Sequence, residues 1–160
     1  MPSRKPFRIG RSRTGLGLFA TKSFRKGQTV VEYSGRHISS QEADRLEDEG
    51  RNSYLFAITK KWTIDGSSRK NYGRYVNHSC RPNAEAIMRH TGRLEYAAMR
   101  RIEPGEEVTV DYGKEYYRIF LQERGCLCAA CAKRAQVKRS GIKRSKRKAS
   151  KKRGKRDNRK

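Results

Sequence analysis

The chain has 160 residues and carries 40 lysine and arginine side chains against 16 aspartates and glutamates, for a formal charge of +24. Sixteen of the basic side chains lie between Lys133 and Lys160, where Asp157 is the one acidic residue. A segment of this composition has too little apolar surface to bury a core. We therefore expect a basic N-terminal arm over residues 1–6, one domain of about 130 residues, and a disordered tail rich in lysine and arginine over residues 133–160.

Hydropathy excludes several classes of protein. No run approaches the roughly 18 apolar residues that a membrane-spanning helix needs, so we expect no membrane partner. The basic N-terminus is not followed by an apolar stretch, and a secretory signal is therefore not expected. In such a chain the four cysteines are expected to be thiols or metal ligands rather than disulfides. We expect an intracellular protein.

Short β-strands dominate the first 112 residues. Turn signals at Asp65-Gly66, Thr91-Gly92 and Pro104-Gly105 separate several of the segments, and the pair around Thr91 is typical of a hairpin. β-Branched, aromatic and alternating residues predict strands at 7–9, 29–33, 54–59, 62–64, 85–88, 94–99 and 107–112.

Two short helices are predicted. Ser39 and Glu42 form a capping box, and Gly50 suits the end of a helix over 40–49. A second helix is expected over 114–124, with Tyr116 and Phe120 four residues apart and Gly125 as its stop. There is no internal repeat and no alternation of strands with helices, which argues against a doubly wound fold.

A cysteine cluster predicts a metal site. Cys126, Cys128 and Cys131 fall within six residues, and Cys80 stands 46 positions before the first of them. Four thiolates in tetrahedral arrangement are typical of structural zinc, which would tie the segment after the second helix to the domain. Free thiols, another soft metal or an iron–sulfur cluster are also compatible with this spacing.

Other motifs are weak when each is taken by itself. The polar run at 77–83 follows the apolar pair Tyr75-Val76 and is compatible with a solvated loop. Its glycosylation sequon is expected to be accidental, because we do not expect the chain to be exported. The two glycines at 15 and 17 are not followed by a helix, so they do not predict a dinucleotide-binding site. Tyr33 and Tyr54 are compatible with plain strand positions in a core.

Five motifs in a fixed order are much more specific. They are Gly15-Leu16-Gly17-Leu18-Phe19-Ala20, Glu32-Tyr33-Ser34-Gly35, Tyr54-Leu55-Phe56, Asn77-His78-Ser79-Cys80-Arg81-Pro82-Asn83, and Glu103-Pro104-Gly105-Glu106-Glu107-Val108-Thr109-Val110-Asp111-Tyr112-Gly113. With them the chain resembles the SET-domain protein-lysine methyltransferases over about residues 7–132, and the cluster Cys126-x-Cys128-x-x-Cys131 is similar to the post-SET segment of that family.

The resemblance implies a mainly β fold of the β-clip type, built from small sheets with short helices. The SET domain would span 7–113, and a post-SET helix and zinc segment would span 114–132. In this fold the 77–83 segment threads beneath the 107–112 segment as a pseudoknot.

The resemblance also implies a site. S-adenosylmethionine would bind on one face, and the target lysine would enter a narrow aromatic channel from the opposite face. Tyr112 matches the catalytic tyrosine, with Tyr33 and Tyr54 lining the channel. The implied cofactor-binding residues are Thr14, Gly15, Leu16, Gly17, Tyr54, Asn77, His78, Tyr112 and Leu127, and the implied ligands of a structural zinc are Cys80, Cys126, Cys128 and Cys131.

Some features depart from the family pattern. Two residues precede Cys131 within the cluster, where the common form has four, which predicts a difference from that form in one ligand or in the path of the loop. A cysteine-rich pre-SET segment is missing and the insert after Tyr54 is short, which indicates a minimal enzyme. Val110 stands where the family carries Phe or Tyr, and its smaller side chain predicts the addition of more than one methyl group.

The substrate is expected to be a lysine-containing basic protein, either histone-like or ribosomal. The tail is expected to contact the phosphate backbone of nucleic acid, although a solvated tail or a nuclear-localisation run has the same composition. A zinc-stapled nucleic-acid-binding protein with a catalytically idle SET core is the alternative. The expected location is the cytoplasm or nucleoid in a bacterium, and the nucleus or chromosome in a eukaryote or virus. The sequence carries no signal for an oligomeric state.

Overall fold

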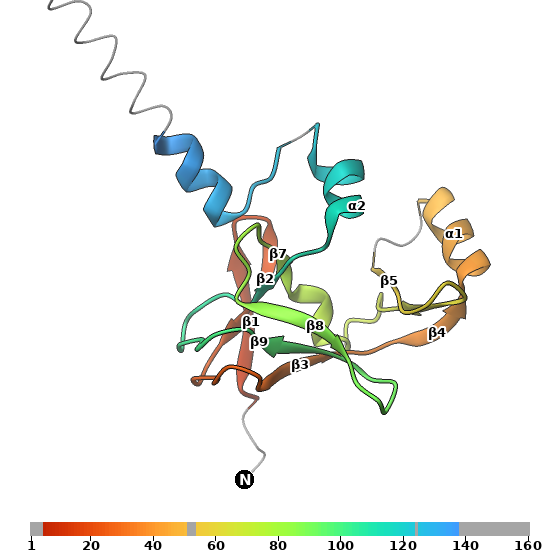
Figure 1. Cartoon of the computed structure of the whole chain (residues 1–160), viewed down its shortest axis with the longest axis horizontal. Helices are drawn as coiled ribbons and strands as arrows, with labels where there is room; N and C mark the ends of the chain where they lie inside the picture. The colour runs from red at the N-terminus through yellow and green to blue at the C-terminus, as the bar shows by residue number, and fades with distance from the viewer. Residues whose placement is uncertain (1–4, 51–53, 124, 138–160) are drawn as a thin grey trace, which may run out of the picture.

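The computed structural model describes residues 5–50, 54–123 and 125–137 (Figure 1). The described part of the chain contains four small sheets. Two have two strands, in the orders β1-β2 and β10-β7, and two have three strands, in the orders β3-β9-β8 and β4-β6-β5. The mainly β architecture expected from the resemblance is confirmed.

The N-terminal hairpin consists of β1 (Phe7–Ser12) and β2 (Gly15–Ala20), which pair antiparallel. Gly15 has a φ of +118°, a backbone conformation that favours glycine, and this lets the chain reverse between the two strands. The hairpin is attached to the 106–108 segment, because Ala20 N donates to Glu106 O at 2.9 Å and Val108 N donates to Leu18 O at 2.8 Å.

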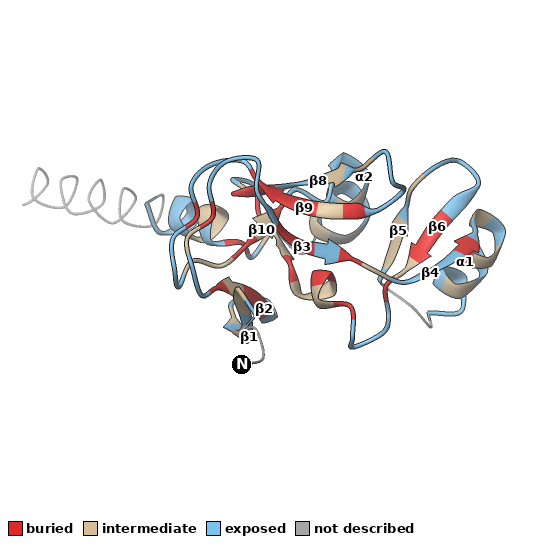
Figure 2. Ribbon diagram, turned by 90° about the horizontal axis from the view of Figure 1, so that it is seen from below, coloured by how far each residue is buried: buried red, intermediate tan, exposed pale blue. Residues whose placement is uncertain are grey.

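The central sheet contains β3 (Thr29–Tyr33), β9 (Leu94–Ala98) and β8 (Ala84–Met88), all antiparallel. β9 lies in the middle, and four of its five residues are buried, as the red segment in Figure 2 shows. The predicted hairpin around Gly92 is confirmed, with β8 beginning one residue earlier than expected. The main core of the molecule packs around this sheet.

The third sheet forms an insert beside the central one. It contains β4 (Arg36–Ser39), β6 (Trp62–Asp65) and β5 (Leu55–Ala57). Helix α1 (Ser40–Asp48) follows β4 directly, and the Ser39 hydroxyl accepts from Glu42 N at 3.2 Å, so the predicted N-cap is confirmed. The sequence reasoning missed β4, whose polar residues give no strand pattern; the strand exists because β6 supplies its hydrogen-bond partners.

The polar run and the segment before Tyr112 lie side by side. A short 3₁₀ helix, η1 (Tyr72–Tyr75), leads into β7 (Asn77–His78), which pairs in parallel with β10 (Thr109–Val110). Beyond the strand, Ser79 N donates to Val110 O at 2.9 Å and Asn83 N donates to Thr109 O at 3.2 Å. This is the contact that the expected threading requires.

The C-terminal part departs from expectation in two places. The predicted helix at 114–124 is a short α-helix, α2 (Lys114–Tyr116), followed by a π-helical turn, η2 (Tyr117–Leu121). Residues 129–137 form a further helix, drawn in blue in Figure 1, so the boundary expected at 132 falls inside a helix. Its first turn carries Cys131 of the cysteine cluster. Residues 138–160 of the expected tail, and residues 1–4 of the arm, lie outside the described residues.

No helix within the described ranges is long and apolar enough to cross a membrane.

Asn83 is predicted to hold the threaded segments together. Its side chain is 3% exposed, its amide nitrogen donates to Glu107 O at 2.8 Å, and its Oδ1 accepts from Thr109 N at 2.9 Å. Asn83→Ala removes the side-chain partner of two partly buried backbone groups, and we expect the free energy of unfolding to fall by about 2–4 kcal/mol. Chemical denaturation measures this, with the exposed Thr91→Ala as a control expected to change by no more than about 0.5 kcal/mol. Equal losses in the two variants would contradict the role given to Asn83.

Candidate active site

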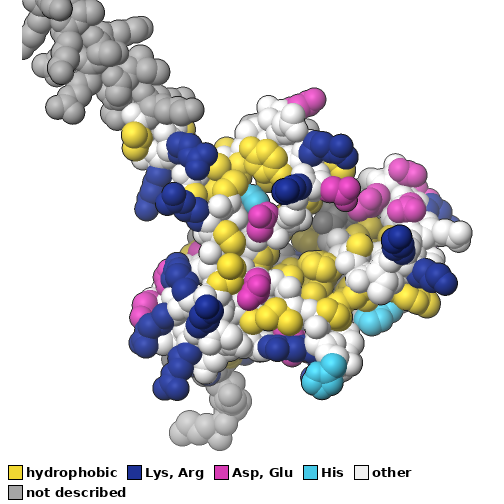
Figure 3. Space-filling model, viewed as in Figure 1, with side chains coloured by type: hydrophobic (Ala, Val, Ile, Leu, Met, Phe, Trp, Pro, Cys, Tyr) yellow, Lys and Arg dark blue, Asp and Glu magenta, His cyan; other side chains and the backbone are white. Residues whose placement is uncertain are grey.

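A cavity in the described part of the chain has a volume of about 830 Å³. It lies between the turn of the β1-β2 hairpin, the η1–β7 segment, the end of β10 and α2, and Figure 3 shows a hollow at this position with hydrophobic side chains on its rim. Its lining includes Thr14, Gly15, Leu16, Tyr33, Tyr54, Arg74, Val76, Asn77, Ala86, Tyr96, Val110, Asp111, Tyr112 and Tyr116.

Two phenols on this lining are fixed by the backbone. The hydroxyl of Tyr33 donates to Tyr54 O at 2.8 Å, and the hydroxyl of Tyr112 donates to Val76 O at 2.7 Å. Each oxygen keeps lone pairs with which to accept a hydrogen bond. Burial raises the pKa of Tyr33 and of Tyr112 well above the ordinary value of a phenol, so both stay neutral at physiological pH.

Tyr54 lies against a charged side chain that the sequence reasoning did not select. The guanidinium carbon of Arg74 lies 3.8 Å from the centroid of the Tyr54 ring, and an Arg74 nitrogen donates to Ser67 O. The Nε of Arg74 is buried without a hydrogen-bond partner. Nothing in the sequence distinguishes Arg74 among 40 basic residues; only its position on the cavity lining does.

Asn77 connects the glycine-containing turn to the polar run. Its amide nitrogen lies 3.0 Å from Leu16 O and 2.8 Å from an oxygen of the Glu107 carboxylate. Gly17 leaves room for this carboxylate, because a Cβ at this position would lie 2.5 Å from the same Glu107 oxygen. Three segments far apart in the sequence therefore meet at one amide.

His78 fixes the backbone at Tyr112. The Nδ1 of His78 accepts from Tyr112 N at 3.2 Å, and the two rings lie 5.6 Å apart. Burial lowers the pKa of His78 although the Asp111 carboxylate opposes this, and the neutral ring is the form that accepts at Nδ1. Because Nδ1 accepts, the proton of the neutral ring lies on Nε2, which is 3.4 Å from Cys80 Sγ.

The structure brings together most of the predicted cofactor set. Thr14, Gly15, Leu16, Tyr54, Asn77 and Tyr112 all line the large cavity. Gly17, His78 and Leu127 do not; His78 instead lines a neighbouring cavity of about 630 Å³ against the 129–137 helix. Leu127 is exposed on the surface, and its carbonyl accepts from Arg13 Nε at 3.3 Å.

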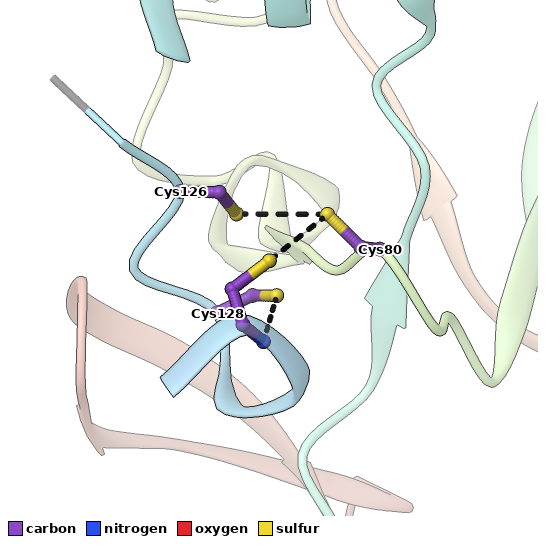
Figure 4. A group of neighbouring side chains, drawn as sticks. Cys80, Cys126 and Cys128 are labelled. Atoms are coloured by element: carbon purple, nitrogen blue, oxygen red, sulfur yellow. Dashed lines mark hydrogen bonds between the residues drawn. The ribbon is translucent and has the colours of Figure 1, made fainter. Parts of the chain in front are cut away.

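The four cysteines converge, as Figure 4 shows for the three that it labels. Their sulfur atoms all lie within 4.8 Å of one another. Cys80 Sγ is 3.8 Å from Cys126 Sγ and 3.6 Å from Cys131 Sγ. A tetrahedral zinc with bonds of about 2.3 Å separates its sulfur ligands by about 3.8 Å. The cluster therefore fits a Cys₄ zinc site, and the shorter spacing before Cys131 is accommodated because Cys131 lies in the first turn of the 129–137 helix.

Protonation of these thiols is uneven. Burial, together with side-chain hydrogen bonds with Cys131 and Cys126, raises the pKa of Cys80 far above the usual value. Burial also opposes ionisation of Cys128, but hydrogen bonds with the backbone of Cys80 and Cys131 outweigh it and lower the pKa of Cys128 to about 6. Four thiolates at this distance repel one another, and a divalent cation among them removes that repulsion.

The family model for the SET domain matches residues 15–113, which is more than half of the chain. The chain therefore belongs to the SET-domain family. Its described part has the small sheets and the paired threading segments that the sequence resemblance implied.

Similar proteins include several named as histone-lysine methyltransferases. The chain is 34% identical over 134 residues to Histone-lysine N-methyltransferase Set2 of Drosophila melanogaster, a match covering 78% of this chain and 6% of that protein. It is 37% identical over 119 residues to Histone-lysine N-methyltransferase MEDEA of Arabidopsis thaliana, covering 70% of this chain and 17% of that one. The chain thus spans a small part of the length of the relatives it matches.

Solved structures agree on the fold. A Chaetomium thermophilum PRC2 described as autoinhibited and bound to S-adenosylmethionine matches with a TM-score of 0.62 and 31% identity, over 69% of this chain and 15% of that one. A humanized mutant of the same complex bound to the inhibitor GSK126 matches with a TM-score of 0.62 and 30% identity, over 69% of this chain and 15% of that one.

Metal removal is predicted to loosen the cysteine-bearing segment. We expect the protein as isolated to hold about one zinc per chain, and chelation to lower the melting temperature and expose the backbone of residues 126–131 to hydrogen exchange. Cys128→Ser should bind less zinc and reproduce both effects, because Cys128 is the most buried of the four thiols. Metal analysis, thermal unfolding and hydrogen exchange are the measurements. Unchanged exchange after complete removal of metal would contradict a structural zinc.

Proposed function

We propose that this chain transfers a methyl group from S-adenosylmethionine to the ε-amine of lysine in a basic protein. The observation that carries the proposal is the cavity in which the hydroxyls of Tyr33 and Tyr112 are tied to backbone carbonyls. Membership of the SET-domain family supports the same reaction. So do relatives named as histone-lysine methyltransferases and a structural neighbour described as bound to S-adenosylmethionine.

The reaction is an in-line displacement. S-adenosylmethionine supplies a sulfonium methyl: a bond forms from the amine nitrogen to the methyl carbon, the carbon–sulfur bond breaks, and sulfur keeps the electron pair as a neutral thioether. The proton of the lysine ammonium leaves to solvent before attack. The free pKa of lysine is about 10.4, and a cavity walled by apolar and aromatic groups disfavours the charged form.

In this proposal the chain acts mainly by positioning and desolvation. Neutral Tyr33 and Tyr112 accept hydrogen bonds from the amine and orient its lone pair toward the methyl group. Their rings attract the ammonium form by a cation–π interaction, but because they carry no charge they do not keep the amine protonated. A carboxylate in their place would hold the amine protonated. Tyr54 forms the wall between the amine and the cofactor.

The cofactor would lie along the turn at 14–17 and across Asn77 and His78, with Leu127 covering it. Arg74 is added to this set because its guanidinium is stacked on Tyr54 at the cavity. Its positive charge suits the carboxylate of the methionine moiety.

Zinc in this proposal is structural. Cys80, Cys126, Cys128 and Cys131 would hold it, and it would fasten the segment after α2 to the loop that follows β7. It takes no part in the displacement.

A histone-like or ribosomal protein is the proposed substrate, since lysine-rich basic tails offer many acceptor amines. The basic residues beyond 137, which lie outside the described residues, would contact nucleic acid through its phosphates and bring the domain to such substrates. The corresponding location is the chromosome, within the nucleus of a eukaryote or the nucleoid of a bacterium. A SET core that only binds nucleic acid remains the alternative that the next experiment tests.

Tyr112→Phe tests the reaction. It removes the phenol oxygen that is fixed on the Val76 carbonyl, and we expect kcat for methyl transfer to fall by about 100-fold or more. Labelled S-adenosylmethionine with mixed core histones or ribosomal proteins gives the readout. Tyr117→Phe, an exposed phenol on the next turn, is the matched control and should keep its rate. Transfer that is equal in the two variants removes Tyr112 from its role, and no transfer by the unmodified chain favours the idle nucleic-acid-binding alternative.

Arg74→Met tests the added cofactor residue. Loss of a charge-assisted contact to the carboxylate should weaken binding of S-adenosylhomocysteine by about 10- to 100-fold. Calorimetry on the full chain measures the affinity, and Arg25→Met, which removes an exposed guanidinium elsewhere, serves as the control. Equal affinities for the two variants would contradict the assignment.

A further inference from the structure

A second cavity lies beside the active-site cavity, and most of its lining has no part in the proposed reaction. It has a volume of about 630 Å³ and lies between the 129–137 helix, the turn of the N-terminal hairpin and the segment that follows β7. The two cavities share Thr14 and Asn77, whereas the phenols of Tyr33 and Tyr112 line the active-site cavity and not the second one. The second cavity therefore offers a chemistry of its own.

Positive charge dominates this lining. Five cationic side chains face two carboxylates around the cavity, which leaves a formal excess of three positive charges. The five are Arg13, Arg81, Arg100, Lys133 and Arg134. Figure 3 shows lysine and arginine side chains gathered where the 129–137 helix meets the body of the domain.

Both carboxylates are already engaged within the protein. Glu106 forms an ion pair with Arg100 at 2.8 Å, and Glu107 accepts from the amide nitrogen of Asn77 at 2.8 Å. Neither carboxylate is therefore available to neutralise the other cations of the lining.

Three of the five cations remain unpaired and open to solvent. Arg81, Lys133 and Arg134 are exposed, and in the part of the chain that the structure describes none of them forms an ion pair with a carboxylate. Like charges around one cavity repel each other, and an anion that enters the cavity removes this repulsion. Guanidinium groups in particular match the geometry of phosphate oxygens.

The 129–137 helix presents two of these cations from a single face. Ala130, Lys133, Arg134 and Val137 all line the cavity. Their spacing of three and four residues places them on one side of an α-helix. Lys133 and Arg134 are therefore directed to the cavity by the helix itself and not by chance rotamers of a loop.

The cysteine cluster brings the cations together. Arg81 directly follows Cys80, and Lys133 lies two residues after Cys131. The Sγ atoms of these two cysteines are 3.6 Å apart. Convergence of the cysteines thus joins cations from distant parts of the sequence at one cavity.

The chain beyond the helix indicates which kind of anion fits. Val137 lines the cavity, and 14 of the 23 residues from 138 to 160 are lysine or arginine. A small anion would neutralise the cavity alone, whereas a nucleic-acid backbone repeats its phosphates and can contact both the cavity and the residues that follow. The described lining has no Phe, Tyr or Trp on which a base could stack, so this contact would read the backbone and not the sequence.

We propose that the second cavity is a phosphate-binding site for duplex nucleic acid, in which Arg81, Lys133 and Arg134 contact the backbone. The inference goes beyond methyl transfer and rests on the nucleic-acid contact of the proposed function, to which it adds a site on the folded domain. Because the cysteine cluster assembles the site, binding at the cavity depends on the metal that the cluster would hold.

Removal of the three unpaired cations tests the proposal. The full chain carrying Arg81→Gln, Lys133→Gln and Arg134→Gln is titrated with a short duplex DNA of random sequence at several salt concentrations, and fluorescence anisotropy gives the affinity. Loss of three phosphate contacts should make the slope of log affinity against log salt shallower by about 2–3. The matched control, Arg25→Gln with Lys60→Gln and Lys61→Gln, removes the same charge from exposed positions outside the cavity and should change the slope by less than about 1.

The metal gives a second readout that a general loss of charge does not reproduce. Chelation should make the slope of the unmodified chain as shallow as that of the cavity variant, and it should leave the slope of the cavity variant unchanged. Both proteins keep residues 138–160, so the difference between them reports the cavity alone.

Three results would overturn the inference. Equal slopes for the cavity variant and the control confine nucleic-acid binding to the basic residues outside the cavity. A loss of affinity for S-adenosylhomocysteine in the cavity variant as large as its loss for DNA, measured by calorimetry, assigns the cavity to the cofactor. The absence of DNA binding by the unmodified chain overturns this inference together with the proposed nucleic-acid contact, whereas methyl transfer, assayed separately, tests the proposed reaction.

Discussion

The parallel pairing of β7 with β10 is the constraint on which the rest of the structure depends. Four residues make the ladder, Asn77 against Thr109 and His78 against Val110, and the side chain of Asn83 completes it from the far end of the run. Two strands this short have little stability of their own. They persist because the core holds both segments in place. The exposed fraction of Val76, Val108 and Val110 is 2% or less in each case.

This pairing brings three proposed functional regions next to one another. Asn77 faces the turn of the N-terminal hairpin, the His78 ring holds the backbone of Tyr112, and Cys80 extends toward the later cysteines. A single run of the chain therefore contacts the proposed cofactor region, the proposed catalytic tyrosine and the proposed zinc site. A shift of the ladder by one residue would exchange the faces of its side chains and separate all three.

The cysteine cluster extends the same arrangement to the C-terminal part of the chain. The segment after α2 has few buried side chains in the described ranges, so hydrophobic packing contributes little to its position. Convergence of Cys126, Cys128 and Cys131 on Cys80 is what brings it back to the domain. The helix of residues 129–137 begins at this point and extends past the boundary expected at residue 132.

The sequence by itself determined the class of fold, the family, the capped helix α1 and the grouping of the four cysteines, because each of these depends on residue type and order along the chain. Only the tertiary structure decided where β4 pairs, that the helix at 129–137 exists, and that Arg74 and Tyr96 line the cavity. Tyr96 looks like any strand tyrosine in the sequence, and Arg74 is one basic residue among many. Their surroundings come from strands and loops distant in the sequence. Local patterns record propensity and periodicity, whereas the partner of a buried hydroxyl or guanidinium is fixed by packing across the whole domain.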